Sequence, residues 1–134
     1  MNPTRLMIAS AVLVFAAAAA NAADKPTKAE KNEARLAELL KGRTAGEPVG
    51  CIPEFQSTRV EVIEGLALVY GMGKTIYVAK PDQPGTVQWD DVMVVKRTGG
   101  QLCNTDIIRT IDRFSGFTTG VVFMGKFVPY RKPD

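Results

Sequence analysis

Residues 60–79 read VEVIEGLALVYGMGKTIYVA, and this stretch decides the fold class. Its apolar and β-branched side chains fall into three short runs with a period of two residues, which is the repeat of a β-strand. Glu64-Gly65 separates the first run from the second, and Gly71–Lys74 separates the second from the third. Short runs divided by glycine-bearing turns are typical of consecutive hairpins. The stretch therefore predicts a β-rich chain with antiparallel pairing.

Upstream of these hairpins, residues 24–41 predict a helix. Thr27 and Glu30 have the spacing of a capping box, and Gly42 supplies a stop signal. The first half of the segment is polar on all sides, so we expect a charged, solvated start rather than a partner-binding helix. The apolar stripe, which predicts a docked end, consists of Ala29, Leu36, Leu39 and Leu40.

Downstream of the hairpins the apolar pattern predicts further strands. Residues 92–95 are a continuous apolar run, which favours a central strand buried on both faces. Residues 107–113 are ambiguous, residues 115–120 predict a Gly/Thr-rich loop, and residues 121–128 predict a last strand. The whole chain thus predicts an α+β, β-rich fold, with an N-terminal helix followed by five or six short antiparallel strands in a curved sheet or small barrel.

The first 22 residues have the order of a secretory signal peptide. Met1–Arg5 is a basic start, Leu6–Ala20 carries no charge, and Ala20-Asn21-Ala22 has small residues at the two positions that a signal peptidase recognises. A membrane anchor is the rival interpretation, but the apolar run is shorter than the roughly 20 residues that span a bilayer. We expect cleavage after Ala22 and a mature protein without a membrane span, located in the periplasm or secreted.

Beyond that segment, the sequence predicts one domain made of a helix and linker over residues 23–48 and a β-rich part over residues 49–134. Its only cysteines, Cys51 and Cys103, are 52 residues apart. An even pair in an oxidising compartment predicts a disulfide, and the spacing does not match that of a redox pair. Free thiols and a redox function remain the alternatives.

Composition excludes several function classes. The chain has no histidine, so Ser-His-Asp and Cys-His catalysis and most catalytic zinc sites have no imidazole. The formal charge of +3 is small and becomes +2 when Arg5 is removed with the signal peptide. A dispersed excess of this size is not typical of a nucleic-acid-binding protein. We therefore expect no metal site, no cofactor and no nucleic-acid partner.

Two motifs invite a catalytic interpretation. Gly71–Thr75 resembles the end of a phosphate-binding loop, but Leu68 occupies the position of the required first glycine, so we interpret the motif as a hairpin turn. Asp106 paired with Asp112 or Asp91 could act as a general acid and base. Their chain positions favour turns instead, because Asx side chains accept backbone N–H groups there.

Aromatic residues near the C-terminus are candidates for partner contact. Phe114 and Phe117 flank a glycine-bearing loop and follow Arg113, whereas Phe123 and Phe127 are predicted core residues. An exposed aromatic loop would be a contact site, but such side chains commonly fold back onto the core. A basic patch that could attract an anionic envelope component is the second candidate, with a solvated surface as its alternative; its residues are Arg109, Arg113, Lys126, Arg131 and Lys132.

Five segments together resemble a family of small exported proteobacterial proteins that has no assigned function. The resemblance covers roughly residues 34–130 and implies export, a disulfide and a single domain, but no catalytic residue. The segments are VGCI at 49–52, TIYV at 75–78, DDVMV at 90–94, QLCNTD at 101–106 and FVPY at 127–130.

The leading hypothesis is a non-catalytic exported envelope protein that binds a protein or a cell-wall polymer. It predicts contact through Arg113, Phe114 and Phe117. A periplasmic hydrolase that uses carboxylates is one alternative. An inhibitor of an envelope hydrolase, acting through residues 114–120 on a disulfide-bonded scaffold, is the other.

Overall fold

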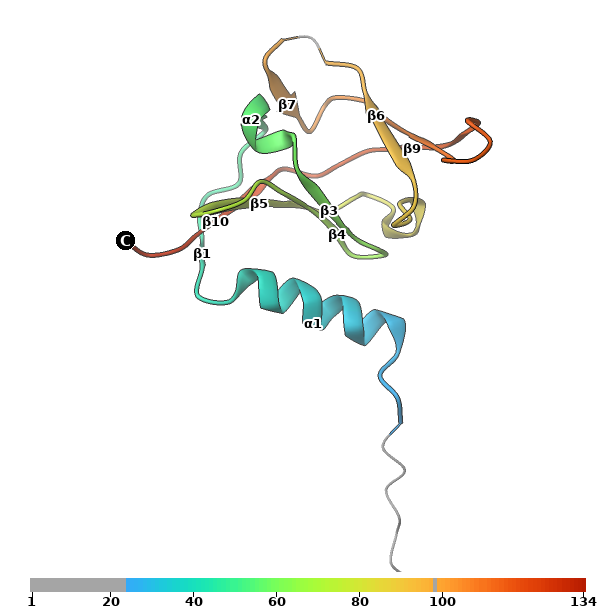
Figure 1. The fold of residues 1–134 in the computed structure, drawn as a ribbon. Coiled ribbons are helices and arrows are strands. Elements are labelled where there is room, and N and C mark those ends of the chain that lie inside the picture. The colour runs from blue at the N-terminus through green and yellow to red at the C-terminus, as the bar shows by residue number, and fades with distance from the viewer. Residues whose placement is uncertain (1–23, 98) are drawn as a thin grey trace, which may run out of the picture.

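The structure, a computed structural model, describes residues 24–97 and 99–134 (Figure 1). The described residues form two α-helices, one short 3₁₀ turn and ten strands, which pair into three antiparallel sheets. The predicted signal peptide lies outside the described residues. Among the residues described, no helix is long and apolar enough to cross a membrane.

The largest sheet has five strands and contains the predicted hairpins. Leu68 on the middle hairpin strand lies opposite Val62 on one side and Ala79 on the other, so the predicted consecutive hairpins are present. Gly65 and Gly71 adopt φ values of 72° and 85° at the two turns, a region that glycine occupies without steric cost. In spatial order the strands are β1 (Thr44–Ala45), β10 (Val128–Arg131), β5 (Thr75–Ala79), β4 (Ala67–Tyr70) and β3 (Val60–Ile63).

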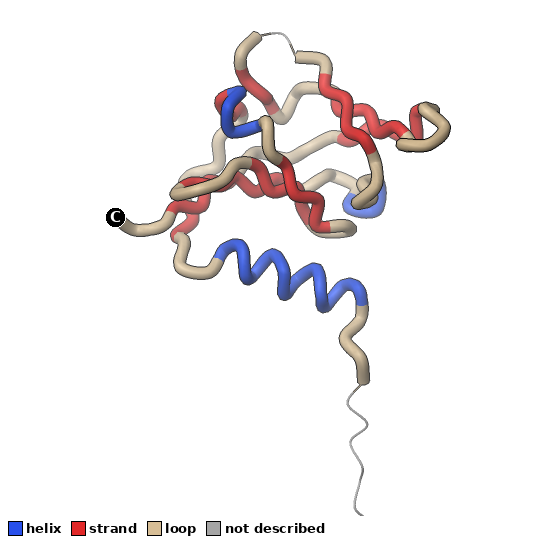
Figure 2. The backbone as a smooth tube through the Cα atoms, in the orientation of Figure 1, coloured by secondary structure: helices blue, strands red, loops and turns tan. Residues whose placement is uncertain are grey.

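One face of this sheet is covered by helix α1, Lys28–Leu40 (Figure 2). The predicted capping box is present, because the Thr27 hydroxyl accepts the Glu30 N–H at 3.2 Å and Glu30 accepts the Thr27 N–H at 2.6 Å. The predicted stripe packs on a cluster of five nearly buried sheet residues. These contacts come from Leu36, Leu39 and Leu40 of α1, and the sheet cluster comprises Ile63, Ala67, Val69, Ile76 and Val78.

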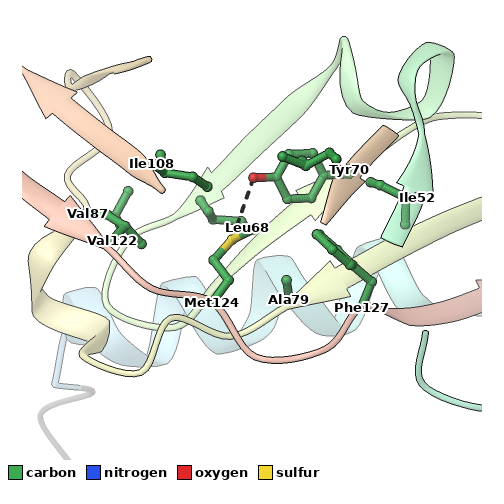
Figure 3. Packing of buried hydrophobic residues seen from close by; sticks show 10 residues of the cluster. Ile52, Leu68, Tyr70, Ala79, Val87, Ile108, Val122, Met124 and Phe127 are labelled. Carbon is green, nitrogen blue, oxygen red and sulfur yellow. Dashed lines mark hydrogen bonds between the residues drawn. The ribbon is translucent and has the colours of Figure 1, made fainter. Parts of the chain in front are cut away.

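The other face of the five-stranded sheet forms the main core (Figure 3). Phe127 is fully buried and meets the Tyr70 ring edge to face, with ring centroids 5.7 Å apart. The Tyr70 hydroxyl donates to the Met124 sulfur at 3.6 Å. Burial raises the pKa of this hydroxyl well above its ordinary value, which keeps it protonated as a donor. The core also includes Ile52, Leu68, Ala79, Val87, Leu102, Ile108 and Val122.

A two-stranded sheet carries the predicted disulfide. Strand β2 (Cys51–Pro53) pairs with β7 (Gln101–Cys103), and the short helix α2 (Glu54–Ser57) follows β2. Cys51 and Cys103 lie directly opposite each other, with their Cα atoms 3.9 Å apart, and are bonded. The prediction of a Cys51–Cys103 disulfide is therefore confirmed.

The third sheet consists of β6 (Val92–Val95), β8 (Ile108–Ile111) and β9 (Thr118–Val122), with β8 in the centre. The 3₁₀ turn η1 (Pro84–Thr86) precedes it in the chain. After β9 the chain crosses from this sheet to the five-stranded one. Isolated bridges pair Met124 with Pro81 and Phe127 with Val49 along that crossing.

Four details of the predicted fold are wrong. The described residues hold ten strands rather than five or six, and their sheets do not close into a barrel. Residues 92–95 form an edge strand with Val92 and Val94 exposed, because only the side chains of Met93 and Val95 pack on the core. Residues 121–128 do not form one strand, since the chain changes sheets between Val122 and Val128.

Candidate functional site

The three-stranded sheet has an exposed side that is largely apolar. Side chains alternate between the two faces of a strand, and Met93, Ile108, Thr110 and Val122 are directed to the core side. We call the opposite side the outer face. It consists of Val92 and Val94 next to Ile107, Arg109 and Ile111, followed by Val121 and Phe123.

The turn between β8 and β9 extends this apolar surface and projects away from the rest of the molecule (Figure 1). The Asp112 carboxylate accepts the N–H of Phe114 at 3.1 Å and of Ser115 at 2.7 Å. The backbone of Asp112 also bonds to Gly116 and Phe117 at 2.9 Å. The turn is thus an ordered structure that holds two aromatic rings in solvent, with Phe114 90% and Phe117 76% exposed.

Sequence reasoning located part of this surface. Arg113, Phe114 and Phe117 are exposed and adjacent to the outer face, and the rings do not fold back onto the core. Phe123 was predicted to be a core residue, but it is 58% exposed on the outer face. Val92, Val94, Ile107 and Val121 were missed, because an apolar run in sequence does not reveal which sheet face lacks a cover.

The predicted basic patch is divided between two parts of the fold. Arg109 and Arg113 belong to the three-stranded sheet and its turn. Arg131 ends β10 in the five-stranded sheet, and Lys132 donates its backbone N–H to Lys74 beside it. In Figure 1 the C-terminus and the β8–β9 turn lie at opposite sides of the molecule. The five basic residues therefore do not form one surface.

The three candidate catalytic carboxylates each serve a turn. Asp91 accepts the Gln88 N–H at 3.0 Å, and Asp106 accepts the Cys103 N–H at 2.8 Å. Asp91 and Asp112 line one shallow hollow of about 390 Å³, whereas Asp106 lines a different one. Hydrogen bonds from Ser115 and Phe114 lower the pKa of Asp112. A general acid needs a raised pKa, so the geometry does not support Asp112 in that role.

The pKa of Asp112 provides a first prediction. A carboxyl whose folded pKa lies below its unfolded pKa contributes stability above the unfolded value and loses it as the pH falls through the folded value. We expect a carboxyl-detected NMR titration to give Asp112 a pKa below 3.8, the ordinary value, with Phe114 and Ser115 amide shifts following the same transition. A pKa raised above the ordinary value would restore Asp112 as a candidate acid.

The phosphate-loop-like motif is a hairpin turn, as predicted. Gly71–Thr75 joins β4 to the start of β5. Gly71 and Gly73 have φ values of 85° and 82°, so the glycines serve the turn geometry. No helix begins there, and the residues after the turn pair as a strand.

A hollow of about 730 Å³ lies between the end of α1 and the five-stranded sheet. Two arginines line it, and one of them, Arg43, donates to the carbonyl oxygens of Leu39, Gly73 and Lys74 at 2.7–3.0 Å. Through these bonds the Arg43 guanidinium holds the end of the helix against the β4–β5 turn. This cation therefore serves the fold.

Within residues 24–97 and 99–134, no group of three or more acidic, cysteine or histidine side chains is arranged to hold a metal ion. No protein-family model, curated protein or solved structure matches this chain. The outer face and its aromatic turn therefore stand as the candidate site on their geometry alone.

Proposed function

We propose that this chain is a non-catalytic binding protein that contacts a partner through the outer face and the β8–β9 turn. One observation carries the proposal. Of the twelve large hydrophobic residues that are exposed in the described part of the chain, seven belong to this sheet and its connections. Large exposed apolar patches are uncommon on soluble monomers and mark interaction sites. The seven are Val92, Val94, Ile107, Phe114, Phe117, Val121 and Phe123.

The proposal places the protein outside the cytoplasm, in the periplasm or secreted. The signal-peptide pattern of residues 1–22 supports export. The Cys51–Cys103 disulfide supports an oxidising compartment, because such bonds are rare where thiols are kept reduced. The partner is then an envelope or extracellular component.

Phe117→Ala tests the proposed surface. We expect the variant to lose partner binding by more than about tenfold, because exposed aromatic anchors dominate the energy of many interfaces. Its stability should be unchanged, since the ring makes few contacts in the free protein. The matched control is Phe55→Ala, which removes a similarly exposed ring (73%) from α2, outside the three-stranded sheet.

The measurement is an affinity pull-down from envelope extract with wild-type protein, Phe117→Ala, Arg113→Ala and Phe55→Ala, quantified by mass spectrometry. A partner that is depleted with the Phe117 and Arg113 variants but retained with the Phe55 variant supports the surface. Equal recovery with all four proteins would remove this surface from consideration.

Inhibition of an envelope hydrolase is a second candidate function. It is favoured by the ordered turn, since a loop held in its bound shape by Asp112 loses less entropy when it enters an active site. Titration of a periplasmic hydrolase with the protein tests this form of binding. Full hydrolase activity at saturating protein rejects it for the enzyme tested.

A further inference from the structure

A single cation lies at the centre of the outer face. Arg109 is on the central strand β8, and its Cα partners on the two neighbouring strands are Val94 and Val121. Along the chain, the neighbours two residues away are Ile107, just before β8, and Ile111 at its end. Aliphatic residues are therefore the register partners of Arg109 on both neighbouring strands and its nearest same-face neighbours along the chain.

This guanidinium has no acidic partner within the described chain, because none of the ion pairs there includes Arg109. Beside it is a shallow hollow of about 360 Å³, which Lys96 also lines. The one acidic residue of the hollow is Asp106, whose carboxylate accepts the Cys103 N–H at 2.8 Å. Two cations and one carboxylate leave the hollow with a net positive charge.

An apolar ring around a cation favours one kind of partner group. When a partner covers Val94, Val121 and Ile107, water is excluded from Arg109, and a buried charge without a partner is costly. A carboxylate at that position removes the cost, since it can accept two parallel hydrogen bonds from the planar guanidinium. Arginine is also enriched among the central, energetically dominant residues of interfaces.

A second copy of the chain does not supply this group. In a two-fold symmetric contact, a residue near the symmetry axis faces its own copy. Stacking two outer faces would place Arg109 against Arg109, with Lys96 nearby and no carboxylate to compensate except the already bonded Asp106.

The aliphatic character of the face favours a polypeptide over a cell-wall glycan. Apart from Arg109, the outer face offers five aliphatic side chains and the Phe123 ring, none of which forms conventional hydrogen bonds; the aliphatic ones are Val92, Val94, Ile107, Ile111 and Val121. Glycan hydroxyls buried on such a surface would lose their hydrogen bonds to water without replacement. Apolar side chains of a polypeptide incur no such cost.

This inference rests on the proposed function. We propose that the outer face recognises a protein segment in which an aspartate or glutamate is flanked by apolar residues. Arg109 binds the carboxylate, and Lys96 assists. The flanking apolar side chains pack on the surrounding valines and isoleucines. The aromatic turn at Phe114 and Phe117 covers the end of the segment.

The probe is a phage-displayed library of random linear peptides, panned against the purified protein and against Arg109→Glu. We expect wild type to enrich peptides with an acidic residue between apolar residues, and the charge-reversed variant to enrich lysine or arginine at that position. An enriched peptide is then synthesised, labelled and titrated by fluorescence anisotropy. Replacing Arg109 by glutamine should weaken its binding roughly 10- to 100-fold, and exchanging the peptide's acid for its amide should cost a similar factor.

Arg131→Gln is the matched control, because Arg131 is an exposed arginine on β10 in the other sheet. It should leave the affinity unchanged, and circular dichroism should show that all variants remain folded. Restoration of affinity when Arg109→Glu is combined with a peptide whose acid is replaced by lysine would support direct pairing of the two charges.

The outcomes separate this inference from the proposed function. Peptides that lose affinity with Phe117→Ala but are indifferent to Arg109→Gln overturn the carboxylate recognition and leave the surface in place. Peptides indifferent to both variants overturn both. Absence of any enrichment, or Phe117-dependent co-sedimentation of the protein with purified peptidoglycan in place of peptide binding, overturns the polypeptide partner.

Discussion

Phe127→Ala is expected to lower the free energy of unfolding by about 3–5 kcal/mol. The ring is fully buried, so truncation loses its apolar burial. It also loses the edge-to-face contact with Tyr70, which stabilises the fold beyond the area that the ring buries. The ring also lies where the chain passes from the three-stranded sheet to the five-stranded one, in a buried cluster that contains residues of both sheets. Truncation would leave a cavity within this cluster.

Urea denaturation followed by fluorescence and circular dichroism measures this loss. Phe123→Ala is the matched control, because it removes the same side chain four residues earlier from a position that is 58% exposed. The control should change the free energy of unfolding by less than about 1 kcal/mol. Similar losses for the two variants would contradict the assignment of Phe127 to the core and of Phe123 to the outer face.

Replacing both Cys51 and Cys103 by serine is expected to cost about 4 kcal/mol of stability. The bond closes a loop with a sequence separation of 52 residues, and in the chain-entropy model a cross-link of that span restricts the unfolded chain strongly. The closed loop contains β3, β4, β5 and β6, which are strands of two different sheets. The cross-link therefore limits the unfolded states of both sheets at once.

The measurement compares the double variant with oxidised wild type by thermal and urea unfolding. Wild type treated with a reductant that keeps both thiols free serves as the control, because it loses the bond without a change of sequence. Both samples should show the same loss. A loss below about 1 kcal/mol in both would mean that the bond restricts the unfolded chain much less than the chain-entropy model assumes.

Local sequence signals predicted the parts of the fold that depend on nearby residues. Thr27 and Glu30 predict the start of α1, because a capping box satisfies backbone donors within one turn. Gly65 and Gly71 predict the hairpins, since the turns need positive φ values that other residues avoid. The cysteine pair is found by counting, as two cysteines allow one intramolecular bond.

The missed features depend on contacts between distant residues. Val92 and Val94 belong to an apolar run, yet they are exposed because no element covers the outer face of their sheet in the described chain. The last strand was predicted to end at residue 128, but Pro129 lies inside β10 opposite Tyr77. The two-residue strand β1 and the three-residue strands β2 and β7 are too short for a period of two residues to be recognised.

Only part of the candidate site was likewise predicted from the sequence. Arg113, Phe114 and Phe117 were predicted because a glycine-bearing turn with two aromatic residues is unusual in a solvated loop. The position of Arg109 between Val94 and Val121 could not be predicted, because it follows from the pairing register of three strands that are distant in sequence. Only the folded sheet shows that aliphatic residues lie beside this cation on both neighbouring strands.

The way in which helix α1 is attached to the sheet affects the motions that we expect of the molecule. None of its 13 residues is fully buried, whereas the sheet residues beneath it, such as Ile63 and Val69, are 3% and 4% exposed. Their burial depends on α1, which contacts the sheet through three leucines and through surface ion pairs such as Arg35–Glu61. Each surface ion pair adds little to stability. Transient lifting of α1 is thus a sub-global opening with a lower free energy than complete unfolding. It would uncover a second apolar sheet face, on the opposite side of the five-stranded sheet from the main core, without disturbing the outer face.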